Sequence, residues 1–127
     1  MSRILIIEDE EDVSAPLEAW LAKEGFDVVV AADGETGLEQ ALTTFPDVIV
    51  LDLTLPGLPG EEICKQVREH DRPEINSIPI ITISGKDTEA DRIVGKVIGA
   101  SAYLPKPFDT LDLIDGVRWF LHKKQRS

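Results

Sequence analysis

The chain alternates strand-length apolar runs with segments of helical periodicity along its whole length. The apolar runs lie at residues 3–7, 27–32, 47–53, 78–84 and 102–104. Helical spacing occupies residues 13–24, 35–44, 60–69, 88–98 and 109–124. Because the runs are apolar at consecutive positions, they indicate strands that are covered on both faces of a parallel sheet. Right-handed crossovers then predict an α/β fold, doubly wound in three layers.

Composition narrows both the number of domains and the kinds of partner. The 127 residues are 43% hydrophobic, which predicts one domain spanning residues 1–127 and no output domain. With 13 basic and 24 acidic residues the formal net charge is −11, which argues against non-specific binding to nucleic acid or to anionic membranes. No apolar run could span a bilayer or act as a secretory signal, and a single cysteine, Cys64, fits a reducing compartment. We therefore expect a cytoplasmic protein with no membrane contact.

Polar side chains stand where several of the predicted strands end. Glu8 and Asp9 follow the first strand, Asp52 ends the buried part of the third, Ser84 ends the fourth and Lys106 follows the fifth. In doubly wound sheets ligands bind outside the carboxyl ends of the strands, so we expect these five side chains to converge on one crevice.

The three converging carboxylates would need a compensating cation. Two carboxylates at ~4 Å repel by about 4 kcal/mol at an effective dielectric near 20. Oxygen ligands without His or Cys indicate Mg²⁺ or Mn²⁺ rather than zinc. The next acids along the chain are expected to form a solvated, dipole-stabilised cap on the first helix: Glu10, Glu11 and Asp12.

Lys106, Ser84 and Asp52 together indicate phosphate chemistry. A lysine places a positive charge beside phosphoryl oxygens, and a serine hydroxyl donates a hydrogen bond to them. A carboxylate such as Asp52 can attack phosphorus to give an acyl phosphate. Each residue alone is weak evidence, and the combination carries the interpretation.

Four blocks resemble, in order and spacing, the signature blocks of the receiver domain of bacterial response regulators: "ILIIEDEE", "VIVLDLTLPGLPG", "ITISGKD" and "GASAYLPKPF". The resemblance covers essentially the whole chain. It implies the flavodoxin-like (βα)5 fold with strand order 2-1-3-4-5. It also implies that Asp52 is the phosphoacceptor. The metal would be held by Asp9, Asp52 and the backbone carbonyl of Thr54, with Glu8 acting through a water molecule.

The resemblance also implies the parts of a switch. Ser84 would be the hydroxyl that moves toward the phosphoryl group, and Lys106 would be the cation that pairs with it. Tyr103 would be the aromatic residue that follows Ser84, although from its position alone it reads as a half-buried edge-strand residue. Pro107 would follow a cis peptide bond.

Further positions bear on lifetime and partners. Thr54 and Lys86 stand where relatives tune the lifetime of the phosphoryl group. A sensor histidine kinase or phosphotransfer protein would be the donor. A protein target or a second copy would bind the surface made by the helices at 88–98 and 109–124 and the strand at 102–104, with no direct binding of nucleic acid. Trp119 lies opposite the apolar face of the last helix, either as an interface residue or as a ring lying over its neighbours.

Alternative functions are open from the residues. A phosphatase of the haloacid-dehalogenase type also has a nucleophilic Asp at a strand end, but it needs an acid at the position of Thr54. A flavodoxin-like binding module needs a glycine- and hydroxyl-rich phosphate loop after the first strand, where this chain has "EDEED". An interaction module that is never phosphorylated would not need the complete set of acids, serine and lysine. The expected protein is therefore a signalling switch that acts on no substrate beyond its own phosphoryl group.

Overall fold

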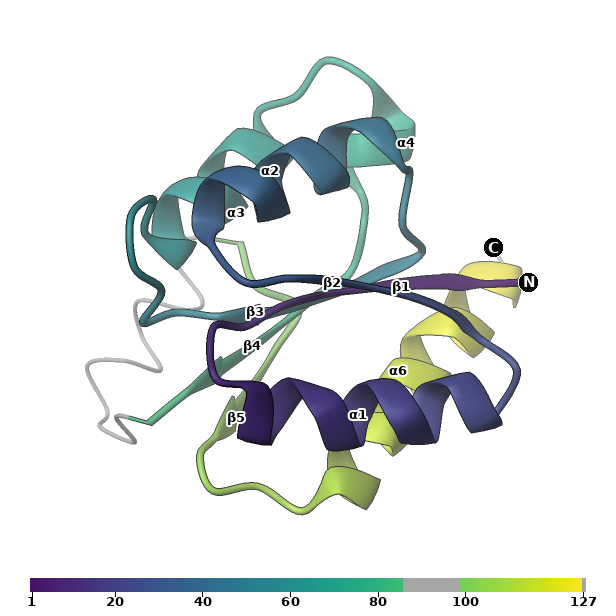
Figure 1. The fold of residues 1–127 in the computed structure, drawn as a ribbon. Coiled ribbons are helices and arrows are strands. Elements are labelled where there is room, and N and C mark those ends of the chain that lie inside the picture. Colours follow the sequence, from purple (N-terminus) through teal and green to yellow (C-terminus); the bar gives the residue numbers. More distant parts are fainter. Residues whose placement is uncertain (86–98, 127) are drawn as a thin grey trace.

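The computed structural model, which describes residues 1–85 and 99–126, has a parallel β-sheet between two layers of helices (Figure 1). The sheet has five strands in the order β2-β1-β3-β4-β5, and every neighbouring pair is parallel. The strands are β1 (Arg3–Ile7), β2 (Asp27–Ala31), β3 (Val48–Asp52), β4 (Ile80–Ser84) and β5 (Ala102–Pro105). The predicted fold class and strand order are confirmed.

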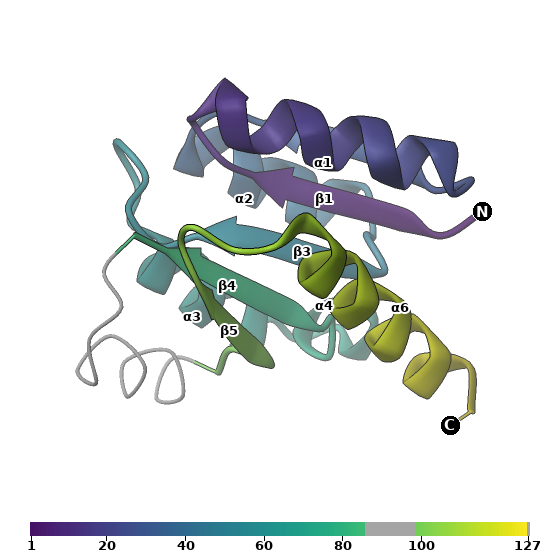
Figure 2. The ribbon, with the colours of Figure 1, turned by 90° about the horizontal axis from the view of Figure 1, so that it is seen from below.

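The helices cover both faces of the sheet, as the doubly wound prediction requires. They are α1 (Glu11–Lys23), α2 (Gly34–Thr43), α3 (Gly60–Arg68), α4 (Pro73–Asn76) and α6 (Thr110–Arg126). Helices α1 and α6 lie on one face, and α2, α3 and α4 lie on the other (Figures 1 and 2). The helix predicted at 88–98 lies outside the described residues. Across the described ranges, no helix combines the length and apolarity needed to cross a bilayer.

The buried strands supply side chains alternately to the two faces. In β1, Ile4 and Ile6 pack with α1 and α6, whereas Leu5 and Ile7 pack with α2 and α3. All five residues of β3 are buried, so this strand has no solvent-facing side. A fully buried aliphatic side chain contributes about 1.5–3 kcal/mol, so both layers of helices are held to the sheet mainly by apolar burial.

Local sequence sets the ends and the close packing of the helices. Gly25, with a φ of 95°, lies just beyond α1 in a backbone conformation that glycine adopts without strain. Asp33 caps α2 by accepting a hydrogen bond of 2.8 Å from the Thr36 amide, which lowers the pKa of Asp33. Gly37 lets α2 approach β1 closely, since a Cβ there would lie 2.6 Å from Ile7.

Arg68 ties the end of α3 to the chain on both sides of β4. Its guanidinium donates to the carbonyl oxygens of Asn76 at 3.0 Å, Ile78 at 2.8 Å and Gly99 at 2.9 Å. Burial lowers its pKa. Arg68 thereby holds the segment that leads into β5 at the end of α3.

Candidate functional site

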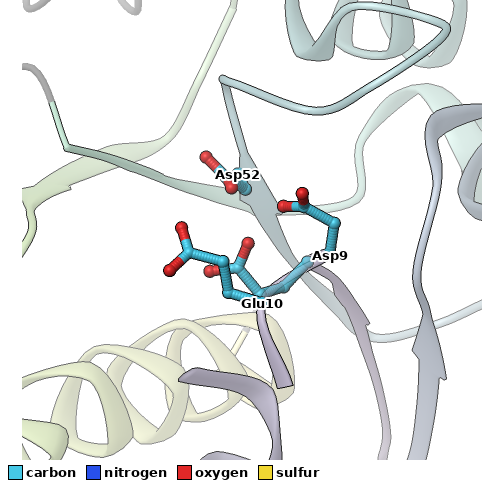
Figure 3. Close-up of side chains that lie close together, drawn as sticks. Asp9, Glu10 and Asp52 are labelled. Carbon is cyan, nitrogen blue, oxygen red and sulfur yellow. The ribbon is translucent and has the colours of Figure 1, made fainter. Parts of the chain in front are cut away.

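Four carboxylates meet beyond the carboxyl ends of β1 and β3. Glu8, Asp9, Glu10 and Asp52 each offer an oxygen, and these oxygens lie within 4.8 Å of one another. Figure 3 shows Asp9 and Glu10 gathered with Asp52 at this edge of the sheet. Glu8 and Asp52 are buried, while Asp9 and Glu10 are exposed. The structure thus brings together the three acids that the strand ends predicted and adds a fourth.

Asp52 presents two carboxylate oxygens with different surroundings. Its Oδ1 accepts hydrogen bonds from the backbone amide and from the hydroxyl of Thr54, both at 3.0 Å. Its Oδ2 lies 3.3 Å from the Nζ of Lys106. One oxygen is therefore held by the following loop, and the other faces a cation.

The backbone that follows Asp52 is fixed by close packing. A Cβ at Gly60 would lie 2.8 Å from the carbonyl oxygen of Asp52. A Cβ at Gly34, the first residue of α2, would overlap the carbonyl oxygen of Leu58. Because these two glycines have no Cβ, the loop between β3 and α3 can pack closely against the backbone of its neighbours. This loop carries Thr54.

Lys106 lies among three carboxylates. Its Nζ is 2.6 Å from Oε1 of Glu8, 3.3 Å from Oε1 of Glu10 and 3.3 Å from Oδ2 of Asp52. The lysine side chain is only 13% exposed. An ammonium in this position compensates part of the negative charge of the cluster, and its low exposure limits how far solvent weakens these interactions.

The remaining predicted switch residues lie on β4 and β5. Ser84 is the buried last residue of β4, one position beyond the residue paired with Asp52, and its carbonyl accepts a hydrogen bond of 2.7 Å from the Lys106 amide. Tyr103 lies half-buried on β5. The peptide bond between Lys106 and Pro107 is cis. Lys86 lies outside the described residues.

The buried carboxylates titrate as a pair. Burial, and then the neighbouring Asp52, raise the pKa of Glu8 to about 8. Burial also opposes ionisation of Asp52, but hydrogen bonds from Glu8 and Thr54 outweigh it and lower the pKa of Asp52. Burial likewise opposes the charge on Lys106, yet Glu8 and Asp52 raise its pKa above the ordinary value. In the metal-free pair, protonation is therefore favoured at Glu8 and ionisation at Asp52.

The residues present fit a divalent metal ion. Neither oxygen of the buried Glu8 carboxylate receives a hydrogen bond of ordinary geometry from the described residues, although Oε1 pairs with Lys106. The cluster contains four carboxylates and no His or Cys. Orphaned carboxylate oxygens in an excess of negative charge are ligands that suit Mg²⁺ or Mn²⁺.

The structure adds a contact to the sequence interpretation at Glu10. The residue is the N-cap of α1 and its side chain is 60% exposed, as expected of a solvated acid at a helix start, but it makes no capping hydrogen bond. Its carboxylate instead pairs with Lys106. No local signal in "EDEED" could have shown this, because the lysine is distant in sequence.

Trp119 lies on α6, outside the acidic cluster. The residue is 56% exposed. The ring of Phe120 meets it edge to face at a centroid distance of 4.9 Å, and the Lys123 ammonium lies 5.1 Å from its centroid. The ring therefore contacts its neighbours and is also accessible, and its role at an interface stays a prediction.

Known proteins with similar sequences are sensory and transcriptional regulators. Sensory transduction protein RegX3 of Mycolicibacterium smegmatis is 38% identical over 123 residues, which cover 97% of this chain and 52% of that protein. Alkaline phosphatase synthesis transcriptional regulatory protein SphR of Synechococcus elongatus is 41% identical over 135 residues, covering 99% of this chain and 51% of that protein. The chain therefore spans about half the length of these relatives.

Structural similarity and a family model agree with these relatives. A CheY-like response regulator receiver domain protein from Methanospirillum hungatei JF-1 superposes with a TM-score of 0.89 and 25% identity, covering 99% of this chain and 98% of that one. The family model for the response regulator receiver domain matches residues 4–118. The chain, with its acidic cluster at the end of a doubly wound sheet, belongs to the response regulator receiver domain family.

Proposed function

We propose that this domain is a phosphorylation-controlled switch in which Asp52 accepts a phosphoryl group from the phosphohistidine of a sensor histidine kinase or phosphotransfer protein. One observation carries the proposal: Asp52 is buried at a strand end, with Oδ1 bonded to Thr54 and Oδ2 facing Lys106. A carboxylate that is held by one oxygen leaves the other free to act as a nucleophile.

The transfer conserves atoms and charge. Oδ2 of Asp52 attacks phosphorus, the P–N bond to the donor imidazole breaks, and the nitrogen keeps the electron pair. The protein mainly positions the reactants and neutralises charge, since such transfers need little covalent help. Lys106 lies where it can balance the negative charge of the phosphoryl oxygens.

A divalent cation, Mg²⁺ or Mn²⁺, would supply the remaining positive charge at this site when bound. Asp9, Asp52 and the backbone carbonyl of Thr54 would hold it directly, and Glu8 would hold it through a water molecule. The shortage of positive charge around these acids supports this assignment.

Ser84 and Lys106 would detect the phosphoryl group. A neutral hydrogen bond contributes about 0.5–1.5 kcal/mol and a charge-assisted one about 1.5–3 kcal/mol. Shifting a two-state equilibrium from 1:99 to 99:1 needs about 5.5 kcal/mol, which is more than these two contacts provide. The unmodified domain would therefore already sample the active form, or a partner would complete the shift.

The conformational change caused by phosphorylation would be transmitted through β5 and α6. Movement of Ser84 would let Tyr103 follow and so change the surface of β5 and α6. The third predicted part of that surface, the helix at 88–98, lies outside the described residues. A protein target or a second copy of the chain would bind that surface, and Trp119 offers it an exposed aromatic ring. Thr54 and Lys86 would set the lifetime of the phosphoryl group through their effect on water. The domain itself would not bind nucleic acid, consistent with its formal charge of −11.

Labelling by a small phosphodonor tests this function. The wild-type chain should take up phosphoryl groups from acetyl phosphate only with Mg²⁺ or Mn²⁺ present, and hydroxylamine should release the label, as expected of an acyl phosphate. Asp52→Asn should abolish uptake. Asp115→Asn is the matched control, because Asp115 lies exposed on α6. Undiminished labelling of Asp52→Asn would refute the assignment.

The alternative functions have less support. The phosphatase of the haloacid-dehalogenase type lacks its second acid, because position 54 is a threonine. A module that is never phosphorylated predicts no labelling of the wild-type chain. The same experiment therefore separates it from the proposed switch.

A further inference from the structure

Lys106 has as many carboxylate neighbours as its ammonium group has N–H donors. The neighbours are Glu8 at 2.6 Å, Glu10 at 3.3 Å and Asp52 at 3.3 Å. An ammonium has three donors and no acceptor. Because Oδ2 of Asp52 becomes the bridging oxygen of the acyl phosphate, phosphoryl oxygens take over its contact with Lys106, and any further phosphoryl contact competes with Glu8 and Glu10 for the ammonium.

Glu8 and Glu10 differ in how easily they can leave Lys106. The side chain of Glu8 is 0% exposed and lies 2.6 Å from the ammonium, whereas that of Glu10 is 60% exposed and lies 3.3 Å from it. A buried polar group that lost this contact would have no solvent to replace it. An exposed ion pair contributes little to stability, so Glu10 is the neighbour that can be given up.

The surroundings of Glu10 fix its backbone and leave its side chain room to move. Its carbonyl accepts hydrogen bonds from the amides of Val13 and Ser14 in the first turn of α1, both at 3.0 Å. Glu10 and Lys106 also line an open cavity of about 370 Å³ between α1 and the segment after β5. The carboxylate can therefore turn from the ammonium into solvent without any change in the fold.

We propose that Glu10 is an exchangeable counter-ion of Lys106, which holds the ammonium before phosphorylation and is displaced from it by the phosphoryl group. This inference rests on the proposed phosphorylation of Asp52. Glu10 competes with the phosphoryl group for Lys106, and its charge repels an approaching anionic donor. It therefore lowers both the rate of phosphorylation and the fraction of the domain that stays phosphorylated.

A different role for Glu10 predicts the opposite result. Its carboxylate lies within the group of acids that could hold a metal ion. If Glu10 were a ligand of that ion, its removal would weaken Mg²⁺ binding and slow phosphorylation. A counter-ion of Lys106 instead slows phosphorylation while it is present, so the sign of the effect separates the two roles.

The test compares Glu10→Gln with the matched control Glu11→Gln. Both changes remove one exposed carboxylate, but only residue 10 pairs with Lys106. With acetyl phosphate and saturating Mg²⁺, Glu10→Gln should be labelled about 1.4- to 5-fold faster than wild type, the range of an exposed ion pair. Glu11→Gln should stay within about 1.2-fold of wild type, because salt and solvent screen a charge that makes no contact. The gain in Glu10→Gln should shrink toward unity at high ionic strength.

Specific outcomes overturn the inference. Equal rates for Glu10→Gln and Glu11→Gln would show that the pairing with Lys106 has no effect on phosphorylation. Slower labelling of Glu10→Gln together with weaker Mg²⁺ binding would make Glu10 a metal ligand. If wild type is labelled and Asp52→Asn is not, either of these two results for Glu10→Gln would refute this inference and leave the proposed function standing. An unlabelled wild type would refute the proposed function and the inference with it.

Discussion

Replacing Glu8 with Gln should remove the pH dependence of Mg²⁺ binding between about pH 6 and pH 8. Burial and the nearby Asp52 raise the pKa of Glu8 to about 8, so near pH 7 about nine-tenths of the metal-free molecules carry a proton there. Asp52 has a lowered pKa and is ionised over the same range. Because a bound cation favours ionised carboxylates, Mg²⁺ binding should release about 0.9 protons near pH 7.

The magnitude follows from this linkage. Below the pKa of Glu8, the apparent affinity of the wild-type chain for Mg²⁺ should fall about tenfold for each pH unit. In Glu8→Gln the affinity should be nearly constant over this range, and at high pH it should be weaker than in wild type, because one negative charge is missing. Calorimetric titration in two buffers of different ionisation enthalpy measures the released protons directly.

Glu11→Gln serves as the control and should release as many protons as wild type, since residue 11 makes no contact with Lys106 or Asp52. Proton release near 0.9 in Glu8→Gln would refute the account, because the proton would then come from another group. Release near zero in the wild-type chain would refute it equally, because Glu8 would already be ionised before the metal binds.

The raised pKa of Glu8 also determines how the free energy of unfolding changes with pH when no metal is bound. Glu8 binds its proton more tightly in the folded chain, where its pKa is about 8, than at its ordinary value of 4.5. Its stabilising contribution is therefore complete below about pH 4.5 and is lost as the pH rises through about 8. Urea unfolding without metal should show wild type losing stability relative to Glu8→Gln across this range.

Further predictions concern the scaffold and the output surface. Arg68→Ala should lower the free energy of unfolding by about 2–4 kcal/mol, because three carbonyl oxygens lose a charged donor. Urea unfolding measures this loss, and a loss under about 0.5 kcal/mol would contradict the prediction. Gly116→Ala should raise stability by up to about 1 kcal/mol, since its Cβ would lie 3.6 Å from the nearest atom. Gly37→Ala should lower stability by about 1–3 kcal/mol, because its Cβ would lie 2.6 Å from Ile7. Thermal unfolding of both variants measures the contrast, and equal shifts would contradict it. Trp119 fluorescence should change on phosphorylation or on binding a partner, and an unchanged spectrum and accessibility would remove it from the output surface.

The sheet could be predicted from sequence because the apolar residues of its strands indicate directly that the strands are buried. The residues of β3 are apolar at consecutive positions, and all of them are buried in the structure. Since parallel strands end at one edge, the positions of Glu8, Asp9 and Asp52 followed from the order of the elements alone. Strand ends differed by one or two residues, as at β4, which begins at Ile80 and not at residue 78.

The features that sequence reasoning missed depend on contacts between distant residues. The one-turn helix α4, Pro73–Asn76, is too short to show helical periodicity. Glu10 looked like one of several acids before a helix, and only its distance to Lys106 reveals its pairing. The unequal surroundings of the two Asp52 oxygens likewise depend on the loop conformation at Thr54. Lys86 lies outside the described residues, so its assigned effect on lifetime stays a prediction.

The central claim is that one carboxylate, Asp52, receives the phosphoryl group. Reducing the phosphorylated wild-type chain with borohydride converts an acyl phosphate into an alcohol, and peptide mass spectrometry then locates the changed residue. The account predicts that the modification lies at Asp52 and that it requires Mg²⁺ or Mn²⁺ during labelling. Reduction at Asp9 or Glu8, or an unreduced phosphate ester at Ser84, would contradict it.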